Sequence, residues 1–147
     1  MATKRHRILT EIKTRLLGAT SAADRVYIGR LTFDSDDTYP IVSIIPSESA
    51  ITDARNERKM IELPIDVIIA LNADHNDVST AIEDMIGSIK AAIESGSVDK
   101  FYDFGTDRAK LRHISDGGYQ QEDSSEFITV SIAFSIQYME RVGDPNT

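Results

Sequence analysis

The residues of this sequence that could carry out acid–base or metal chemistry are few and widely separated. The three histidines, His6, His75 and His113, lack the paired spacing that metal ligation or a proton relay requires. The sequence contains no cysteine, so it can form neither a thiolate metal site nor a disulfide bond. We therefore expect the histidines to lie scattered on the surface, outside any catalytic or metal site.

The acidic residues also fall short of a recognisable site. Asp34, Asp36 and Asp37 resemble the start of a calcium-binding loop, but the glycine and the terminal glutamate expected at fixed spacings are absent. The neighbouring carboxylates Glu83 and Asp84 are adjacent in sequence and would not converge on a pocket. Neither a serine nucleophile elbow nor a phosphate-binding glycine loop occurs. We expect no catalytic residues, no cofactor, no metal and no enzymatic activity.

The charged segment between two regular regions is the better candidate for function. Residues 46–58 show neither a strand nor a helix period, which predicts a long exposed loop. Its charges are of both signs, a pattern that suits protein contacts better than a ligand pocket. Pro64 follows in the next strand and cannot donate a ladder hydrogen bond, which predicts a sheet edge or a bulge there. The predicted protein interface consists of Glu48, Asp53, Arg55, Glu57, Arg58, Lys59 and Pro64.

Two helices and five strands must position these residues. Apolar spacing predicts helices over 4–17 and 75–95, each followed by a glycine. Strict alternation predicts long strands over 61–71 and 126–140, whereas 25–31, 41–45 and 109–115 read as shorter strands. The dipeptide Gly117-Gly118 predicts a turn before the last strand. The fold expected is α+β, with a single mostly antiparallel β-sheet and two main helices packed on one face.

The length of 147 residues fits one domain with one hydrophobic core. We expect this domain to span 1–147 with a flexible tail over 142–147. The core should bring the apolar faces of the two long strands together with the second helix. Its predicted members are Ile65, Val67, Ile69, Ile82, Ile86, Ile132 and Phe134.

Net charge restricts the partners that the chain can bind. The formal charge is −8, although residues 1–15 are basic, so most of the chain is acidic and would repel a phosphate backbone. No stretch has the roughly 18 uninterrupted apolar residues of a membrane helix. We expect a soluble protein that neither grips nucleic acid nor enters a membrane.

This order of elements resembles the tail terminator family of long-tailed bacteriophages, which includes minor tail protein U. The resemblance covers most of the chain. It is carried by the amphipathic helix from Arg5 to Leu17, the strand Tyr-Pro-Ile-Val-Ser-Ile-Ile-Pro with its charged loop, and the strand from Ile61 to Leu71 that leads into helix 78–95. The long strand from Phe127 to Glu140 completes it.

The resemblance implies a structural virion protein of the tail and neck, assembled in the host cytoplasm. Such a protein forms a homo-hexameric ring that caps the tail tube, ends its polymerisation and offers its other side to the head–tail connector or neck protein. DNA would only pass through the channel. Two alternatives remain open: a head–tail joining or neck completion protein of the same layout, and a small α+β enzyme or ligand-binding module with a dispersed site.

Overall fold

Two helices and seven strands make up the described part of the chain. The computed structural model describes residues 3–34, 36–72, 77–94, 101–104, 107–121 and 126–147. The elements run in the order α1 (Lys4–Leu16), β1 (Val26–Ile28), β2 (Ile41–Pro46), β3 (Ala50–Arg55), β4 (Arg58–Asn72), α2 (Val78–Glu94), β5 (Phe101–Phe104), β6 (Asp107–Asp116) and β7 (Phe127–Arg141).

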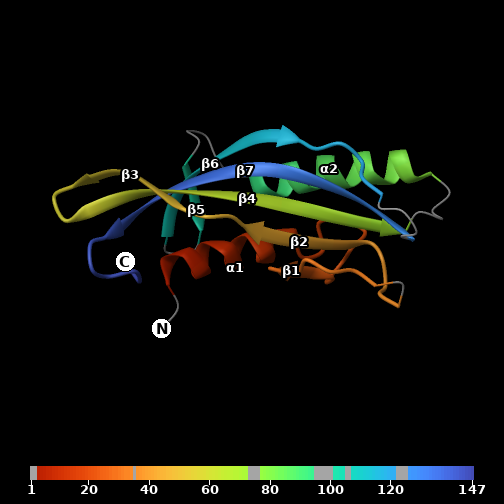
Figure 1. The fold of residues 1–147 in the computed structure, drawn as a ribbon, viewed down its shortest axis with the longest axis horizontal. Coiled ribbons are helices and arrows are strands. Elements are labelled where there is room, and N and C mark those ends of the chain that lie inside the picture. The colour runs from red at the N-terminus through yellow and green to blue at the C-terminus, as the bar shows by residue number, and fades with distance from the viewer. Residues whose placement is uncertain (1–2, 35, 73–76, 95–100, 105–106, 122–125) are drawn as a thin grey trace.

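One sheet contains all seven strands, in the order β1-β2-β4-β7-β6-β5, with β3 pairing along β4. Only β1 and β2 pair in parallel; the other neighbours are antiparallel. The predicted α+β class with a mostly antiparallel sheet is therefore confirmed. The strands β4 and β7 pair over their full 15 residues, from Arg58 with Arg141 to Asn72 with Phe127. Figure 1 shows these two strands running side by side along the length of the molecule.

The hydrophobic core lies between one face of this sheet and the two helices. Alternate residues of β4 and β7 point into it, as the period-2 pattern of both strands requires. Phe134 of β7 is 1% exposed and is among the largest fully buried side chains. All seven predicted core residues are buried in one cluster, together with side chains from both helices. The prediction that both helices pack on one face is confirmed.

Local signals in the sequence mark both ends of α1 and the start of α2. The Thr3 hydroxyl accepts a hydrogen bond from the His6 amide at 3.1 Å, which caps α1. Gly18 just beyond α1 has a φ of +75°, the left-handed conformation that favours glycine. Leu17 was predicted as the last residue of this helix but is 42% exposed, because the helix ends at Leu16. The Asp77 carboxylate accepts from the Thr80 amide at 3.3 Å at the start of α2.

The chain does not turn at Gly117 and Gly118, contrary to the sequence prediction. The Gly117 amide donates to the Ser131 carbonyl at 2.6 Å, and Gln120 exchanges two backbone hydrogen bonds with Thr129. The segment therefore continues alongside β7. A Cβ at Gly117 would meet the Ser131 carbonyl oxygen at 2.7 Å, so a close approach of two backbones explains this glycine.

The C-terminal segment 142–147, predicted to be a flexible tail, makes hydrogen bonds to α1 in the structure. The Lys4 amide at the start of α1 donates to the Pro145 carbonyl at 2.9 Å. The Arg7 side chain donates to the Asn146 carbonyl at 2.6 Å. The first amides of a helix have no partner within the helix, and the tail supplies carbonyl oxygens at that position.

Candidate assembly surface

A three-stranded extension projects from the body of the sheet. It consists of β3, residues Arg58–Met60 of β4 and residues Met139–Arg141 of β7, and we call it the arm. All six residues of β3 are exposed. Figure 1 shows the β3–β4 hairpin projecting at one end of the molecule, near the C-terminus. The predicted loop over 46–58 is therefore exposed as expected, but most of it forms a strand and a tight hairpin turn.

The hairpin turn is formed by Asn56 and Glu57. Their φ angles are +50° and +66°, which is the left-handed pair found in two-residue hairpins. This turn joins Arg55 directly to its partner Arg58. The carbonyl of Glu57 also accepts from the Val142 amide at 2.8 Å, so the end of β7 holds the turn in place.

The structure brings the seven predicted interface residues onto the arm and its base. Asp53 and Arg55 form an exposed ion pair at 3.3 Å, and Lys59 pairs with Glu140 at 3.4 Å. Glu57 lies in the turn and Arg58 begins β4. The exposed residues Glu48 and Pro64 lie at the base.

Pro64 is not on an edge strand, because β4 lies inside the sheet, and it is not in a bulge, because the pairing of β4 with β7 runs unbroken through it. It lies where the neighbour of β4 changes. Residues 58–62 of β4 pair with β3, and residues 65–70 pair with β2. In a strand, the amide and the carbonyl of one residue point to the same side. The Pro64 carbonyl accepts from the Ser47 amide at 2.9 Å, so the missing N–H faces the gap between β2 and β3.

One feature of the arm was missed by the sequence analysis. Arg55 is directly opposite Arg58, and Arg58 is directly opposite Arg141. Residues directly opposite each other in a sheet share a face, so the three side chains form a single row across the three strands. We call Arg55, Arg58 and Arg141 the arginine row. The alternation of apolar residues showed that both long strands exist. It did not show the register between them, which is what places Arg141 opposite Arg58.

The same face of the arm carries an apolar pair next to the arginine row. Met60 lies directly opposite Met139, two residues along β4 and β7 from Arg58 and Arg141. Met60 is half-buried and Met139 is 41% exposed. Methionine and arginine are both enriched at protein–protein interfaces relative to the rest of the surface. This composition is typical of a docking surface.

The arm is connected to α1 and to the C-terminus on one side. The Lys4 ammonium group donates to the Met139 carbonyl at 2.7 Å. A hollow of about 410 Å³ lies at this junction. Its lining is mostly polar: Lys4, Asn56, Glu57, Arg58, Met139, Glu140, Arg141 and Thr147.

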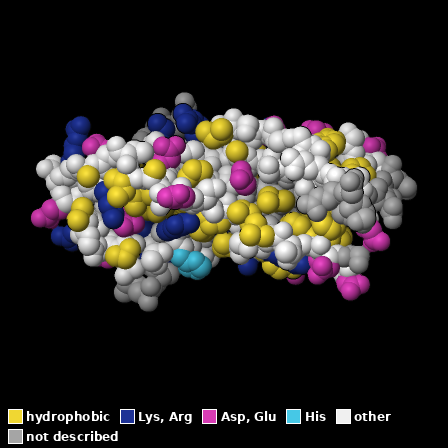
Figure 2. Space-filling model, in the orientation of Figure 1, with side chains coloured by type: hydrophobic (Ala, Val, Ile, Leu, Met, Phe, Trp, Pro, Cys, Tyr) yellow, Lys and Arg dark blue, Asp and Glu magenta, His cyan; other side chains and the backbone are white. Residues whose placement is uncertain are grey.

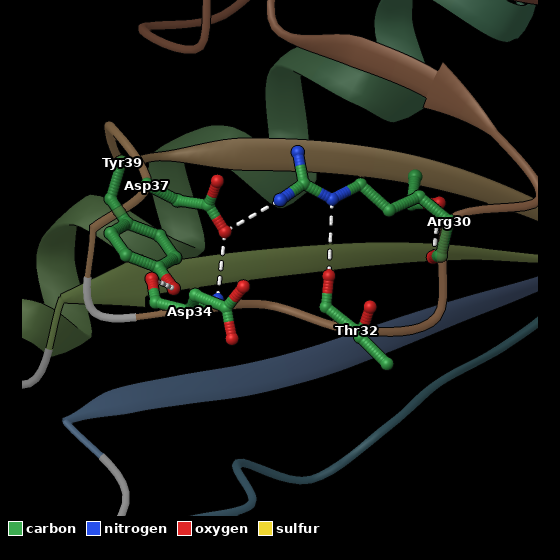
Figure 3. A network of polar contacts seen from close by, with 6 residues as sticks. Arg30, Thr32, Asp34, Asp37 and Tyr39 are labelled. Carbon is green, nitrogen blue, oxygen red and sulfur yellow. Dashed lines mark hydrogen bonds and ion pairs between the residues drawn. The ribbon is translucent and has the colours of Figure 1, made fainter.

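Asp34 and Asp37, two of the aspartates compared above with a calcium-binding loop, belong to a hydrogen-bond network at the opposite end of β4 and β7 (Figure 3). The Arg30 guanidinium donates to Asp37 at 2.5 Å and to the Thr32 carbonyl at 3.0 Å. The Asp34 amide donates to the same Asp37 carboxylate at 2.7 Å, and the Tyr39 hydroxyl donates to the Asp34 carbonyl at 2.6 Å. Hydrogen bonding from Arg30 keeps the pKa of Asp37 below its ordinary value. This carboxylate therefore stabilises the turn.

Aromatic side chains join this turn to the face of the sheet opposite the two helices. The Phe127 ring centroid lies 5.9 Å from those of both Phe33 and Tyr39, so segment 29–40 packs over the start of β7. Burial raises the pKa of Tyr39. The Ser43 hydroxyl, which is fully buried, donates to the Arg30 carbonyl at 2.7 Å. The turn is thereby anchored to β2 and β7.

The histidines are not brought together in the part of the chain that the structure describes. His6 is exposed, and His75 lies outside the described residues. His113 contacts Asp116 at 2.9 Å, and Asp116 also accepts from Lys90 at 3.0 Å. The Lys90 hydrogen bond lowers the pKa of Asp116, with a further contribution from His113. Among the described residues, no group of three or more histidine or acidic side chains could hold a metal ion. Neither described helix is long and apolar enough to cross a membrane.

Comparison with known proteins identifies the fold alone. No family model matches the sequence, and no curated protein matches it. Among solved structures, 34 chains match, so the architecture recurs. One of them is 17% identical, covers 93% of this chain and 98% of its own length, and superposes with a TM-score of 0.59. This likeness extends over the whole domain and shows a shared α+β fold.

Proposed function

We propose that this chain is a structural subunit of the tail terminator kind. Six copies form a ring on the end of a phage tail tube, stop its polymerisation and join the tail to the head connector. The support from sequence is the resemblance of the element order, and the support from structure is the arm. Such a subunit acts through surfaces that bind other proteins.

The arm is the observation that carries this proposal. A closed ring needs a heterologous interface, so each subunit must present two different complementary surfaces. The arm is a distinct surface with fixed backbone geometry, because β7 pairs with β4 up to Arg141. All of its β3 residues are exposed within the subunit. A strand that is ordered but unburied in its own subunit is well suited to contact a neighbour.

The first test is the mass of the purified chain in solution. Light scattering should give six times 16.3 kDa, either for the chain alone or after addition of tail tube protein. Negative-stain electron microscopy should then show rings. A chain that stays monomeric with and without tube protein would contradict the proposal.

The second test separates a terminator from a neck completion protein of the same layout. Tube protein should be polymerised with and without this chain, and tube lengths should be measured by microscopy. A terminator shortens the tubes and labels their ends. A protein that leaves tube length unchanged yet binds finished tails would instead be a completion protein.

A further inference from the structure

The two ends of the β4–β7 pair differ in charge. The arginine row lies at the end where Arg58 pairs with Arg141. At the other end, Asn72 pairs with Phe127, and a strand rise of about 3.3 Å per residue puts these ends roughly 46 Å apart. In Figure 2, the arm half of the visible face carries most of its lysine and arginine, and the far end is mainly acidic.

The arginine row is unfavourable for the isolated subunit. Like charges directly opposite each other in a sheet are destabilising. Arg55 has a partner in Asp53, but among the described residues no carboxylate forms an ion pair with Arg58 or Arg141. Both side chains are exposed. The subunit therefore presents guanidinium groups that an external carboxylate can pair with in bidentate geometry.

The far end of the same chain supplies exposed carboxylates. Glu126 directly precedes β7, while Asp34 and Asp36 follow Phe33, whose ring contacts Phe127. All three side chains are exposed, and no lysine or arginine of the described chain forms an ion pair with them. Leu31, in the same segment, is 69% exposed. We call Asp34, Asp36 and Glu126 the acidic end.

We propose that the arginine row and the neighbouring Met60–Met139 pair dock on the acidic end of a second copy of this chain. The inference rests on the proposed ring and names the two surfaces that form its subunit contact. Charges of opposite sign meet, and the exposed Leu31 provides apolar surface opposite the methionines. Because the two surfaces are different and lie at opposite ends, the contact is heterologous, as ring closure requires.

Charge favours a protein partner over nucleic acid. The whole chain carries −8, and the arginine row is flanked by Asp53, Glu57 and Glu140. Binding to a phosphate backbone relies on many cations acting together, which this mixed surface lacks. Discrete pairing with a few carboxylates fits the row better.

A charge-swap experiment tests the proposed contact. One variant reverses the row (Arg58→Glu with Arg141→Glu), and another reverses the acidic end (Asp36→Lys with Glu126→Lys). Sedimentation velocity over a range of concentrations should show about tenfold weaker self-association for each variant alone. An equimolar mixture should recover wild-type assembly, because each reversed surface then meets its complement. The control pair Lys13→Glu with Arg108→Glu makes the same change in net charge as the row variant, but elsewhere on the chain, and should leave association unchanged.

Engineered cysteines test whether the two surfaces touch. The chain has no native cysteine, so a disulfide can form only at the positions introduced. Arg58→Cys mixed with Asp36→Cys should give a covalent dimer under mild oxidation. Arg58→Cys mixed with Asp24→Cys, an exposed position outside the acidic end, should not.

Failure of this inference can be told apart from failure of the ring proposal. Rings whose assembly is insensitive to both reversals, or no recovery in the mixture, would overturn the docking surfaces and leave the ring intact. Open chains that respond to the reversals would support the docking and contradict the ring. A chain that never self-associates would overturn both. Binding of a short DNA duplex that is lost in the row variant would assign the row to nucleic acid instead.

Discussion

The body and the arm are built from the same two strands, yet different forces hold them. In the body, Ile65 of β4 and its opposite residue Phe134 of β7 are both 1% exposed beneath the helices. In the arm, the same strands continue at Arg58 and Arg141 with exposed side chains. Burial therefore orders the body, whereas the arm is ordered by backbone pairing that the body extends. The regular pairing of β4 with β7 therefore continues beyond the hydrophobic core.

The charged contacts of the body and of the arm also differ. In the segments attached to the body, Arg30 pairs with Asp37 and Lys90 pairs with Asp116. The arm also has ion pairs, Asp53 with Arg55 and Lys59 with Glu140, but three of its arginines lie in one row across the strands. The body's charges favour the subunit's own fold, and the arginine row opposes it. This difference supports the proposal that the arm contacts other proteins.

The largest effect should come from truncating the core. Phe134→Ala should lower the free energy of unfolding by about 3 to 5 kcal/mol, because it removes a fully buried aromatic ring. Met139→Ala in the arm half of the same strand should cost much less, since Met139 is 41% exposed. Urea unfolding of both variants measures the difference. Equal losses would show that the arm contributes to the core as the body does.

A second pair of variants tests the close backbone contact in the body. Gly117→Ala should destabilise the subunit by about 1 to 3 kcal/mol, because its Cβ would overlap the Ser131 carbonyl oxygen. Gly118→Ala is the matched control, since no atom lies within 4 Å of its Cβ position. Thermal unfolding of the two variants should differ clearly, and equal melting temperatures would mean that the contact relaxes freely.

Reversing one charge in the arm should stabilise the subunit, in contrast to the two substitutions in the body. Arg58→Glu replaces two like-charge pairs with two opposite-charge pairs, so the isolated subunit should gain about 0.2 to 1 kcal/mol. Arg112→Glu is the control, because the residue opposite Arg112 is the uncharged Ser135. Denaturant unfolding under conditions that keep the chain monomeric is the measurement. Loss of stability in Arg58→Glu would show that the row supports the subunit's own fold.

The smallest effect concerns pH and the turn attached to the body. The pKa of Asp37 is lowered in the folded state, so its contribution to stability is present above its ordinary pKa of 3.8. That contribution is lost as the pH falls through the lower folded-state pKa. Asp37→Asn should therefore melt at a lower temperature than wild type near neutral pH, with a difference that shrinks below about pH 3.8. A pH-independent difference would mean that the charge is not involved.

The sequence predicted the body much better than the arm. Both long strands and both helices bury one face, and burial imposes the alternation and the helical spacing that a reader can recognise. The strand β3 is exposed at every position, so no buried face imposes a period on it. Its segment was therefore predicted to be a loop, although its backbone pairs regularly.

The candidate site was predicted in part, for a related reason. Mixed charge pointed to the segment that forms part of the arm, which contains Asp53, Arg55 and Arg58. Arg141 escaped because it is distant in sequence and joins the row only through the register of β7. The hydrogen bonds of segment 142–147 were not predicted either, because they join it to residues distant in sequence, the Lys4 amide and the Arg7 side chain.

The position of β7 between β4 and β6 has a consequence for how the subunit matures. The arm's third strand is the end of β7, and Arg58 can meet Arg141 only after the chain has closed a loop that includes α2, β5 and β6. Contacts of such long sequence separation form slowly, because loop-closure entropy must be overcome first. The arginine row is thus completed late in folding. Under the proposed docking, a nascent or partly folded subunit would have no intact docking face, and assembly would be restricted to chains whose body has already formed.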